Sequence, residues 1–212
     1  MEFTIRAGRP DDHQAAEFLT REAFWNLYRP GCDEHFLLNQ LWSHPDFIPE
    51  LFYVAEAGQD IVGLIVFTVS HIESESGVIV KTATFGPVCV LPKYQHHGIG
   101  AGLIQTGLKA AAGLGFPAVI ILGDPHNYCR HGFINCRDFG IADLTGRYPL
   151  GQLIHVFDAH ALQGATWQFT YSGAYNLDES AAKLFDANFP EKALETKPSQ
   201  ELFGMLIRSY LD

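Results

Sequence analysis

Two hydrophobic periods alternate along the chain and predict an order of strands and helices. Short runs rich in β-branched and aromatic residues are typical of strands, and these runs cover 3–6, 51–57, 61–70, 78–91 and 119–122. Apolar residues at helical spacing predict helices over 15–27, 34–42 and 101–114, with a short helical turn over 127–131. A meander of strands followed by one strand–helix–strand unit indicates an α+β protein, which some schemes class as α/β.

Turn residues set the expected boundaries of these elements. Asp11 and Asp12 precede the first helix and are expected to cap it, and Pro30-Gly31 ends it. Gly86-Pro87 interrupts the long fourth strand, which predicts a bulge that separates this strand from its neighbour.

The pattern loosens in the last third of the chain. We expect a last strand over 153–157, followed by helices over 180–187 and 199–206 that Pro190 and Pro198 separate. The 212 residues, 47% of them hydrophobic, suffice for one well-packed domain or for one domain with a small addition.

Charge and cysteine content narrow the function classes. A net charge of −10 argues against a nucleic-acid partner, which requires a basic stripe. The longest strongly apolar stretch, 61–69, is about half of the ~20 residues that a membrane helix needs, so we expect no membrane contact. The charged first residues predict no secretion signal, and four cysteines without a CxxC pair fit reduced thiols in the cytoplasm.

The strongest chemical signal is the segment Gln-His-His-Gly-Ile-Gly from Gln95 to Gly100. It opens a predicted helix, whose first N–H groups are unpaired and lie at the positive end of the helix dipole. Gly98 and Gly100 let the backbone approach a bulky anion, so the segment predicts a phosphate-binding loop. It is neither a Walker A loop nor a dinucleotide fingerprint. A strand-to-helix turn that needs glycine only for its φ angles is the alternative.

A second motif, Tyr128-Cys-Arg-His-Gly-Phe133, follows the next predicted strand. Together the two motifs resemble the GCN5-related N-acetyltransferase (GNAT) superfamily, which combines a Gln/Arg-x-x-Gly-x-Gly/Ala loop with a later Tyr-x-x-x-Gly-Phe element. Residues 31–51 also resemble a bacterial subgroup of uncharacterised N-acetyltransferases. The resemblance implies the GNAT fold, a mixed, splayed β-sheet flanked by helices, over 1–144, with a C-terminal extension over 145–212 packed on it.

The resemblance also implies direct transfer of an acetyl group from acetyl-CoA to an amine, without a covalent acyl-enzyme. The pyrophosphate of acetyl-CoA is then expected on the backbone N–H groups of the loop, and its pantetheine arm along the strand before it. The residues implied to bind the cofactor are Val88, Val90, Gln95, His96, His97, Gly98, Ile99, Gly100 and Ala101. Cys89 has no evident base partner in the sequence and is predicted to be a structural thiol.

Tyr128 matches the usual general acid of the superfamily, beside the departing thiolate. Packing under the cofactor is the alternative role for this residue. Glu34 is our candidate for the general base, and a chain of water molecules is an equal alternative. The other side chains that come into question as the base are His35, His71, Glu73 and Asp124.

The acceptor stays open as a small-molecule or peptide amine, although the acidic balance favours cationic acceptors such as polyamines, aminoglycosides or lysine-bearing peptides. Four aromatic residues of the extension could form a homodimer surface, cover the acceptor site or belong to the core: Trp167, Phe169, Tyr171 and Tyr175.

Two other function classes compete with the enzyme. A non-catalytic acyl-CoA-binding or sensor domain would keep the loop and lack a productive base. A metal-binding protein would use His126, Cys129 and His131, but the sequence offers no fourth ligand at a recognised spacing, so the leading hypothesis includes no metal.

Overall fold

A nine-stranded sheet forms the centre of the structure, a computed structural model that describes residues 2–212. Its strands are β1 (Thr4–Ala7), β2 (Tyr53–Ala57), β3 (Asp60–Ser74), β4 (Ile79–Val90), β5 (Ala118–Leu122), β6 (Ile134–Asn135), β7 (Ile141–Ala142), β9 (Gln152–Val156) and β10 (Trp167–Thr170). Their order is β1-β2-β3-β4-β5-β9-β6, and β10 pairs with β3 and β7. Only β4–β5 and β7–β10 are parallel pairs among these, so the sheet is mixed, and the predicted α+β class is confirmed.

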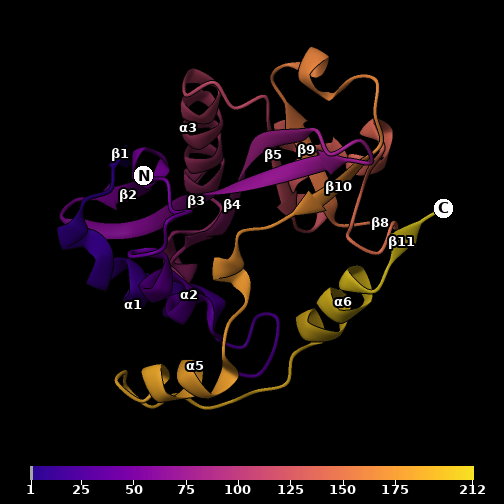
Figure 1. Cartoon of the computed structure of the whole chain (residues 1–212). Helices are drawn as coiled ribbons and strands as arrows, with labels where there is room; N and C mark the ends of the chain where they lie inside the picture. Colours follow the sequence, from indigo (N-terminus) through magenta and orange to yellow (C-terminus); the bar gives the residue numbers. More distant parts are fainter. Residues whose placement is uncertain (1) are drawn as a thin grey trace.

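Helices cover both faces of this sheet, as Figure 1 shows. They are α1 (His13–Phe24), α2 (Glu34–Leu41), α3 (Ile99–Gly113), α4 (Pro125–Tyr128), α5 (Glu179–Asp186) and α6 (Pro198–Ile207). On one face α3 lies over β2–β4, and on the other α1 and α2 pack together. Apolar side chains on alternating strand positions therefore enter two separate cores, and Leu64 and Ile65 of β3 belong to different ones.

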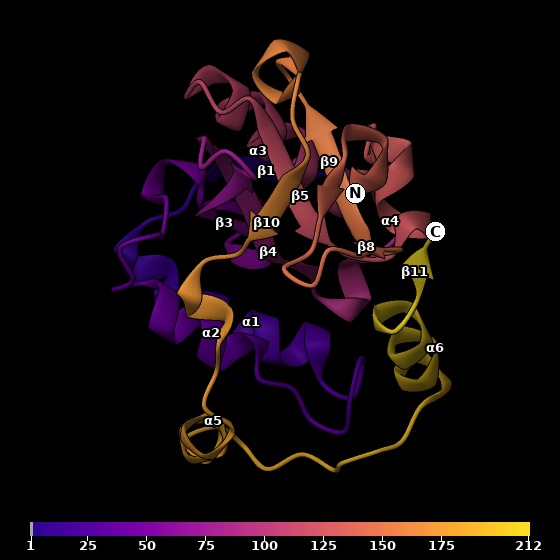
Figure 2. The ribbon, with the colours of Figure 1, turned by 45° about the vertical axis from the view of Figure 1, so that its right-hand side comes forward.

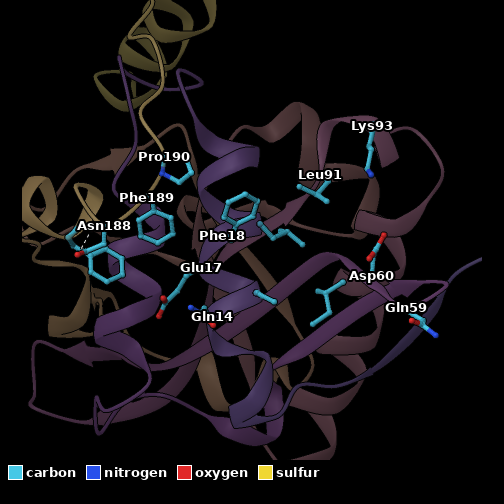
Figure 3. Close-up of a pocket in the computed structure, with 14 residues that line it drawn as sticks. Gln14, Glu17, Phe18, Gln59, Asp60, Leu91, Lys93, Asn188, Phe189 and Pro190 are labelled. Atoms are coloured by element: carbon cyan, nitrogen blue, oxygen red, sulfur yellow. Dashed lines mark hydrogen bonds between the residues drawn. The ribbon is translucent and has the colours of Figure 1, made fainter.

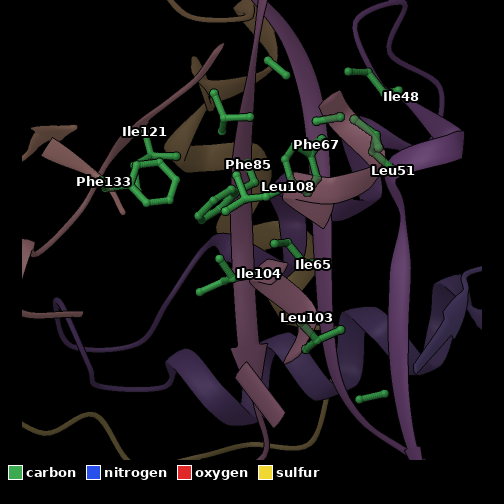
Figure 4. Packing of buried hydrophobic residues seen from close by; sticks show 14 of the residues in the cluster. Ile48, Leu51, Ile65, Phe67, Phe85, Leu103, Ile104, Leu108, Ile121 and Phe133 are labelled. Carbon is green, nitrogen blue, oxygen red and sulfur yellow. The ribbon is translucent and has the colours of Figure 1, made fainter. Parts of the chain in front are cut away.

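The core under α3 is packed very closely (Figure 4). Leu103, Ile104 and Leu108 of this helix belong to the same buried cluster as Ile65 and Phe67 of β3. The small residues of α3 allow this approach. A Cβ atom added to Gly107 would lie 2.5 Å from Cε2 of Phe67.

Of two local expectations from the sequence, the helix cap at Asp12 is wrong and the bulge at Gly86-Pro87 is confirmed. Asp12 stands at the start of α1, but its side chain caps no helix N–H group; it instead accepts hydrogen bonds from Arg6, with 2.6 Å between Nη1 and Oδ2. The bulge predicted at Gly86-Pro87 is confirmed: Ile65 pairs with Val88 and Phe67 with Phe85, so Gly86 and Pro87 of β4 stand opposite the single residue Val66 of β3. β4 nevertheless runs on through the bulge and is paired with β3 on both sides of it.

The chain beyond residue 144 contains more strands than the single one predicted. Within residues 2–212, β9, β10 and a small two-stranded sheet of β8 (Tyr148–Pro149) and β11 (Tyr210–Leu211) all lie in this part. The strand expected as the last one is β9, and it pairs along its length with β5. Short strands whose partners lie far away in the sequence carry no local signal for their place in a sheet.

The end of the chain returns along the helical face and is tied down by polar contacts (Figure 2). Asp186 of α5 accepts a hydrogen bond of 2.5 Å from Nε of Arg21, a side chain that is almost completely buried in α1. Trp25 and Asn26 both donate to the carbonyl of Ala193, at 2.9 and 3.0 Å. These bonds fix the segment that leads into α6, so that α6 is held beside the α1–α2 connection.

We expect Gly107→Ala to destabilise the fold although alanine is the better helix former. The added methyl group would overlap with the buried Phe67 ring, which costs about 1–3 kcal/mol of unfolding free energy. Gly113→Ala is the matched control, because nothing lies within 4 Å of its added Cβ, and it should gain about 0.5–1 kcal/mol. Chemical denaturation measures both values, and equal shifts in the same direction would contradict this packing.

Candidate functional site

The parallel strands β4 and β5 separate after a single pairing point, Ala83 opposite Val119. Beyond this point β4 stays paired with β3 as far as Val90, which lies opposite Gly63. The Leu91 N–H donates to Val62 O at 2.9 Å. Hydrogen-bonded and non-hydrogen-bonded pairs alternate along antiparallel strands, so the backbone N–H and C=O groups of Val88 and Val90 point away from β3. The backbone of β4 is therefore open along the gap that faces β5.

The predicted loop lies at the end of this gap. Gln95 fixes it there, because its Nε2 donates to Val90 O at 3.1 Å. Gly98 has a φ of 83° and is the N-cap of α3, and the first helical bond runs from Gly102 N to Gly98 O. Within residues 2–212, the N–H groups of 98–101 donate to no protein acceptor. Four donors thus converge at the start of a 15-residue helix, which is the arrangement that binds anions.

A cleft of about 680 Å³, the loop cleft, opens along β4 and the loop. It brings together most of the residues predicted to bind a cofactor, and Tyr128 with them: Val88, Val90, Gln95, His96, Gly98, Ile99, Gly100, Ala101 and Tyr128. The His97 side chain is not part of the lining, because its Nδ1 lies 2.7 Å from Gln95 O within the loop. The lining contains Arg130, His96 and His131 and no carboxylate, so an anionic ligand meets no repulsion there.

A second cavity of about 630 Å³, the acidic cavity, adjoins the loop cleft. Both are lined by Phe24, Tyr28, Val88 and Tyr128, so the two spaces meet at these side chains. Among the side chains that come into question as a base, Glu34 and Asp124 line the acidic cavity. His35, His71 and Glu73 line neither space.

Glu34 has the properties of a base that works near neutral pH. It is half-buried at the start of α2, and burial raises its pKa to about 7. Hydrogen bonds from backbone N–H groups stabilise the carboxylate and lower the pKa, but their effect is smaller than that of burial. His35, by contrast, is completely buried next to Asp186, and burial lowers its pKa. A carboxylate with a pKa near the ambient pH accepts and returns a proton readily.

Tyr128 is held at the junction of the two spaces by a group of aromatic rings. Its ring centroid lies 5.7 Å from that of Phe85 and 6.0 Å from that of Phe133, and its edge packs over Gly123. Burial raises the pKa of its phenol, so the hydroxyl stays protonated at neutral pH. Within residues 2–212 no group hydrogen-bonds to this hydroxyl, which leaves it available as a donor to a ligand.

Sequence reasoning missed Tyr28, which lines both spaces. Burial, together with the charges of Glu34 and Asp124, raises its pKa to about 12. Its ring stacks on Phe203 of α6, with centroids 4.2 Å apart. No motif surrounds Tyr28 in the sequence, and its place depends on how the α1–α2 connection folds against the end of the chain.

Other candidate chemistry finds no support in the structure. Cys89 is buried toward α1, its thiol lies 3.6 Å from Thr20 Oγ1, and burial raises its pKa to about 12, which disfavours the reactive thiolate. Across the described chain, no three His, Cys, Asp or Glu side chains gather as a metal site. A groove of about 890 Å³ on the outer side of α1, around Phe18 and Lys93, contains none of the predicted site residues (Figure 3).

A comparison with known families identifies the domain. Residues 49–135 match the family model described as Acetyltransferase (GNAT) domain, and this range includes β4, the loop and Tyr128. The chain carries a GNAT acetyltransferase domain. The resemblance predicted from the two motifs is thus confirmed, whereas Glu34 and the end of the chain lie outside the matched residues.

Individual relatives agree with this family. The chain is 34% identical over 102 residues to the uncharacterized N-acetyltransferase YjhQ of Escherichia coli, covering 48% of this chain and 55% of that protein. It is 32% identical over 138 residues to the mycothiol acetyltransferase of Streptomyces bingchenggensis, covering 61% and 42%. The chain therefore spans about half the length of these curated relatives.

A solved structure shares the fold. The GNAT family N-acetyltransferase YhbS of Escherichia coli, crystallised with CoA, superimposes with a TM-score of 0.71 at 24% identity, covering 84% of this chain and 93% of that one. The predicted GNAT fold is confirmed by this likeness. No helix within residues 2–212 is long and apolar enough to cross a membrane.

We expect Glu34 to lower the stability of the fold as the pH rises. Its pKa is raised from 4.5 to about 7 on folding, so the folded state holds the proton more tightly and stability falls between these two pH values. The Glu34→Gln variant cannot ionise, so its unfolding free energy relative to the parent should rise by about 2 kcal/mol from about pH 5 to about pH 8. Denaturant titrations at both pH values measure this difference. The exposed Glu50→Gln is the control, and a constant difference for Glu34→Gln would disprove the raised pKa.

Proposed function

We infer that this protein is an acetyl-CoA-dependent N-acetyltransferase that transfers the acetyl group directly to an amine. The observation that carries the inference is the set of four unpaired N–H groups at 98–101, at the end of a gap that leaves the backbone of β4 open. A pyrophosphate accepts hydrogen bonds from such groups, and a pantetheine arm carries amides that pair with an open strand. YhbS, with the same fold, was crystallised with CoA.

The chain's own residues support a division of roles in the reaction. Gly98 and Gly100 present their N–H groups to the pyrophosphate, and Arg130 adds a positive charge to the same cleft. The N–H groups of Val88 and Val90 point into the gap, where one of them can polarise the thioester carbonyl. The acetyl group is thereby placed where the loop cleft meets the acidic cavity, beside Tyr128.

Glu34 and Tyr128 have different parts in the reaction: Glu34 accepts a proton, and Tyr128 donates a hydrogen bond. Glu34 takes one proton from the ammonium form of the acceptor, and the neutral nitrogen attacks the carbonyl carbon as the C–S bond breaks. The nitrogen then loses its second proton, which neutralises the thiolate that leaves, so that the products are an amide and the CoA thiol. Because its pKa is raised, Tyr128 acts as a hydrogen-bond donor to the developing thiolate and is a poor source of a free proton.

The remaining predictions are consistent with this proposal. All four cysteines are free in the described chain, which fits the reducing cytoplasm that we propose as its location. A non-catalytic acyl-CoA sensor would bind the cofactor in the same cleft without transferring the acetyl group. A homodimer stays a prediction.

Acetyl-CoA should stabilise the protein through the loop. At about 100 times the dissociation constant, the melting temperature should rise by about 5–10 °C, and acetyl-pantetheine, which lacks the pyrophosphate, should give almost no shift. Gly98→Ala should abolish the shift, because a side chain at a φ of 83° strains the loop that presents the N–H groups. Gly115→Ala is the matched control, with the same φ of 83° and equally open surroundings beyond the other end of α3. A full shift in Gly98→Ala would refute binding at this loop.

Tyr128→Phe should lower kcat by about 10–100-fold, because a charge-assisted hydrogen bond to the thiolate is lost. The KM for acetyl-CoA should stay within about twofold, since the ring still packs between Phe85 and Phe133. Steady-state release of the CoA thiol, with acetylated amine as the second product, measures both constants. Unchanged kcat would assign Tyr128 to packing alone, and cofactor binding without any transfer would favour the sensor.

A further inference from the structure

The acidic cavity is partly built by the C-terminal extension. Tyr171, Tyr175, Glu179 and Phe203 line it from this part of the chain, opposite Glu34 of α2. Tyr175 is fixed by a hydrogen bond of 3.1 Å from its hydroxyl to the carbonyl of Gly86 in β4. A cavity of about 630 Å³ is in the size range of sites for small molecules. The extension therefore closes the acceptor side into a pocket for a small molecule.

The walls of this cavity carry negative charge that is only partly compensated within the cavity. Four carboxylates line it, those of Asp33, Glu34, Asp124 and Glu179, and Arg29 is the cation among its lining residues. Arg29 is already paired with Asp33. Within residues 2–212, no Lys, Arg or His lies within ion-pairing distance of Glu34, Asp124 or Glu179.

The charge is specific to this cavity and is not a general consequence of the acidic composition. The adjoining loop cleft has no carboxylate in its lining, although the whole chain has a net charge of −10. Like charges gathered around one cavity repel each other, and a cationic ligand relieves this repulsion. The two spaces are thus matched to ligands of opposite charge.

Aromatic faces provide the rest of the wall. Tyr28 stacks on Phe203, and Tyr171 meets Tyr175 edge to face with centroids 6.2 Å apart. Such rings pack against an apolar carbon chain and also attract a cation placed over a ring face. Neither the charge nor the rings suit a neutral, strongly polar acceptor.

We propose that the acceptor is a small amine with an apolar carbon chain and a second positive charge at the far end of that chain. Glu34, a half-buried carboxylate in the wall of the cavity that Tyr128 also lines, takes the proton of the reacting nitrogen. Asp124 and Glu179, which are exposed at the rim, attract the second cation. This assignment rests on the acetyltransferase function proposed above and adds the class of acceptor to it.

The test compares amines that differ only in the far end of the chain. α,ω-Diamines of about three to six carbons are assayed beside the monoamine and the amino alcohol of equal length, with acetyl-CoA as donor. The best diamine should exceed both partners in kcat/KM by about tenfold or more, because a charge-assisted contact is gained. The advantage should shrink as salt is added, since the rim charges are exposed.

Variants then assign the preference to the cavity. Glu179→Gln should reduce the advantage of the diamine over the monoamine by about threefold, as expected for the loss of an exposed charge. Glu191→Gln is the matched control, an exposed carboxylate of the same extension that lines neither space.

The outcomes separate the two proposals. If monoamines are acetylated as fast as every diamine, the proposed acceptor class is wrong and the transferase function stands. A preference for a lysine peptide over all diamines would have the same meaning. No transfer to any amine, in a protein that acetyl-CoA stabilises, would overturn the transferase function and the acceptor class with it.

Discussion

Within residues 2–212, β4 has no partner strand on its outer side beyond the pairing of Ala83 with Val119, and the site is built around this unpaired edge. Buried backbone groups cannot stay without hydrogen-bond partners at low cost, so an open strand inside a sheet requires something to occupy the gap. The rings of Phe85, Tyr128 and Phe133 pack together where the strands part, with centroids 5.7 to 6.0 Å apart. They keep the strands apart and place the Tyr128 hydroxyl beside the gap.

The separation of the strands also divides the site into two electrostatic halves. One half ends at the unpaired N–H groups of α3 and contains no carboxylate, whereas the other gathers carboxylates around aromatic rings. A protein with a net charge of −10 can bind a polyanion in this way, because local dipoles and the nearest side chains set the potential in a cleft. The C-terminal extension contributes to this division. The ion pair of Arg21 with Asp186 holds α5 against the helical face, and further along the chain Phe203 stacks on Tyr28.

Local signals in the sequence were enough to predict the loop and the tyrosine turn that line the loop cleft. The loop from Gln95 to Gly100 and the tyrosine turn need particular residues at fixed spacing, because the backbone there adopts positive φ angles and ends in a helix. Glu34 could be chosen only weakly, since nothing near it in the sequence reveals that folding half-buries its carboxylate and raises its pKa. The helices and the main strands also followed from hydrophobic periodicity, with boundaries within a few residues.

Long-range contacts account for what the sequence did not reveal. Tyr28, Glu179 and Phe203 meet around one cavity from positions far apart in the chain, and each looks like an ordinary surface residue in its own segment. The pairing of β9 with β5 depends likewise on a partner that periodicity does not identify. Asp12 is a different case, because its partner is close in the sequence: Arg6 of β1, six residues earlier, binds its carboxylate.

A crystal structure of the protein with CoA tests the central claim most directly. The account predicts pyrophosphate oxygens within hydrogen-bond distance of the N–H groups of 98–101, and pantetheine amides paired with the backbone of Val88 and Val90. The sulfur should then lie beside the Tyr128 hydroxyl, where the loop cleft meets the acidic cavity. CoA bound elsewhere, for example in the groove on the outer side of α1, with the loop N–H groups left to water, would contradict it.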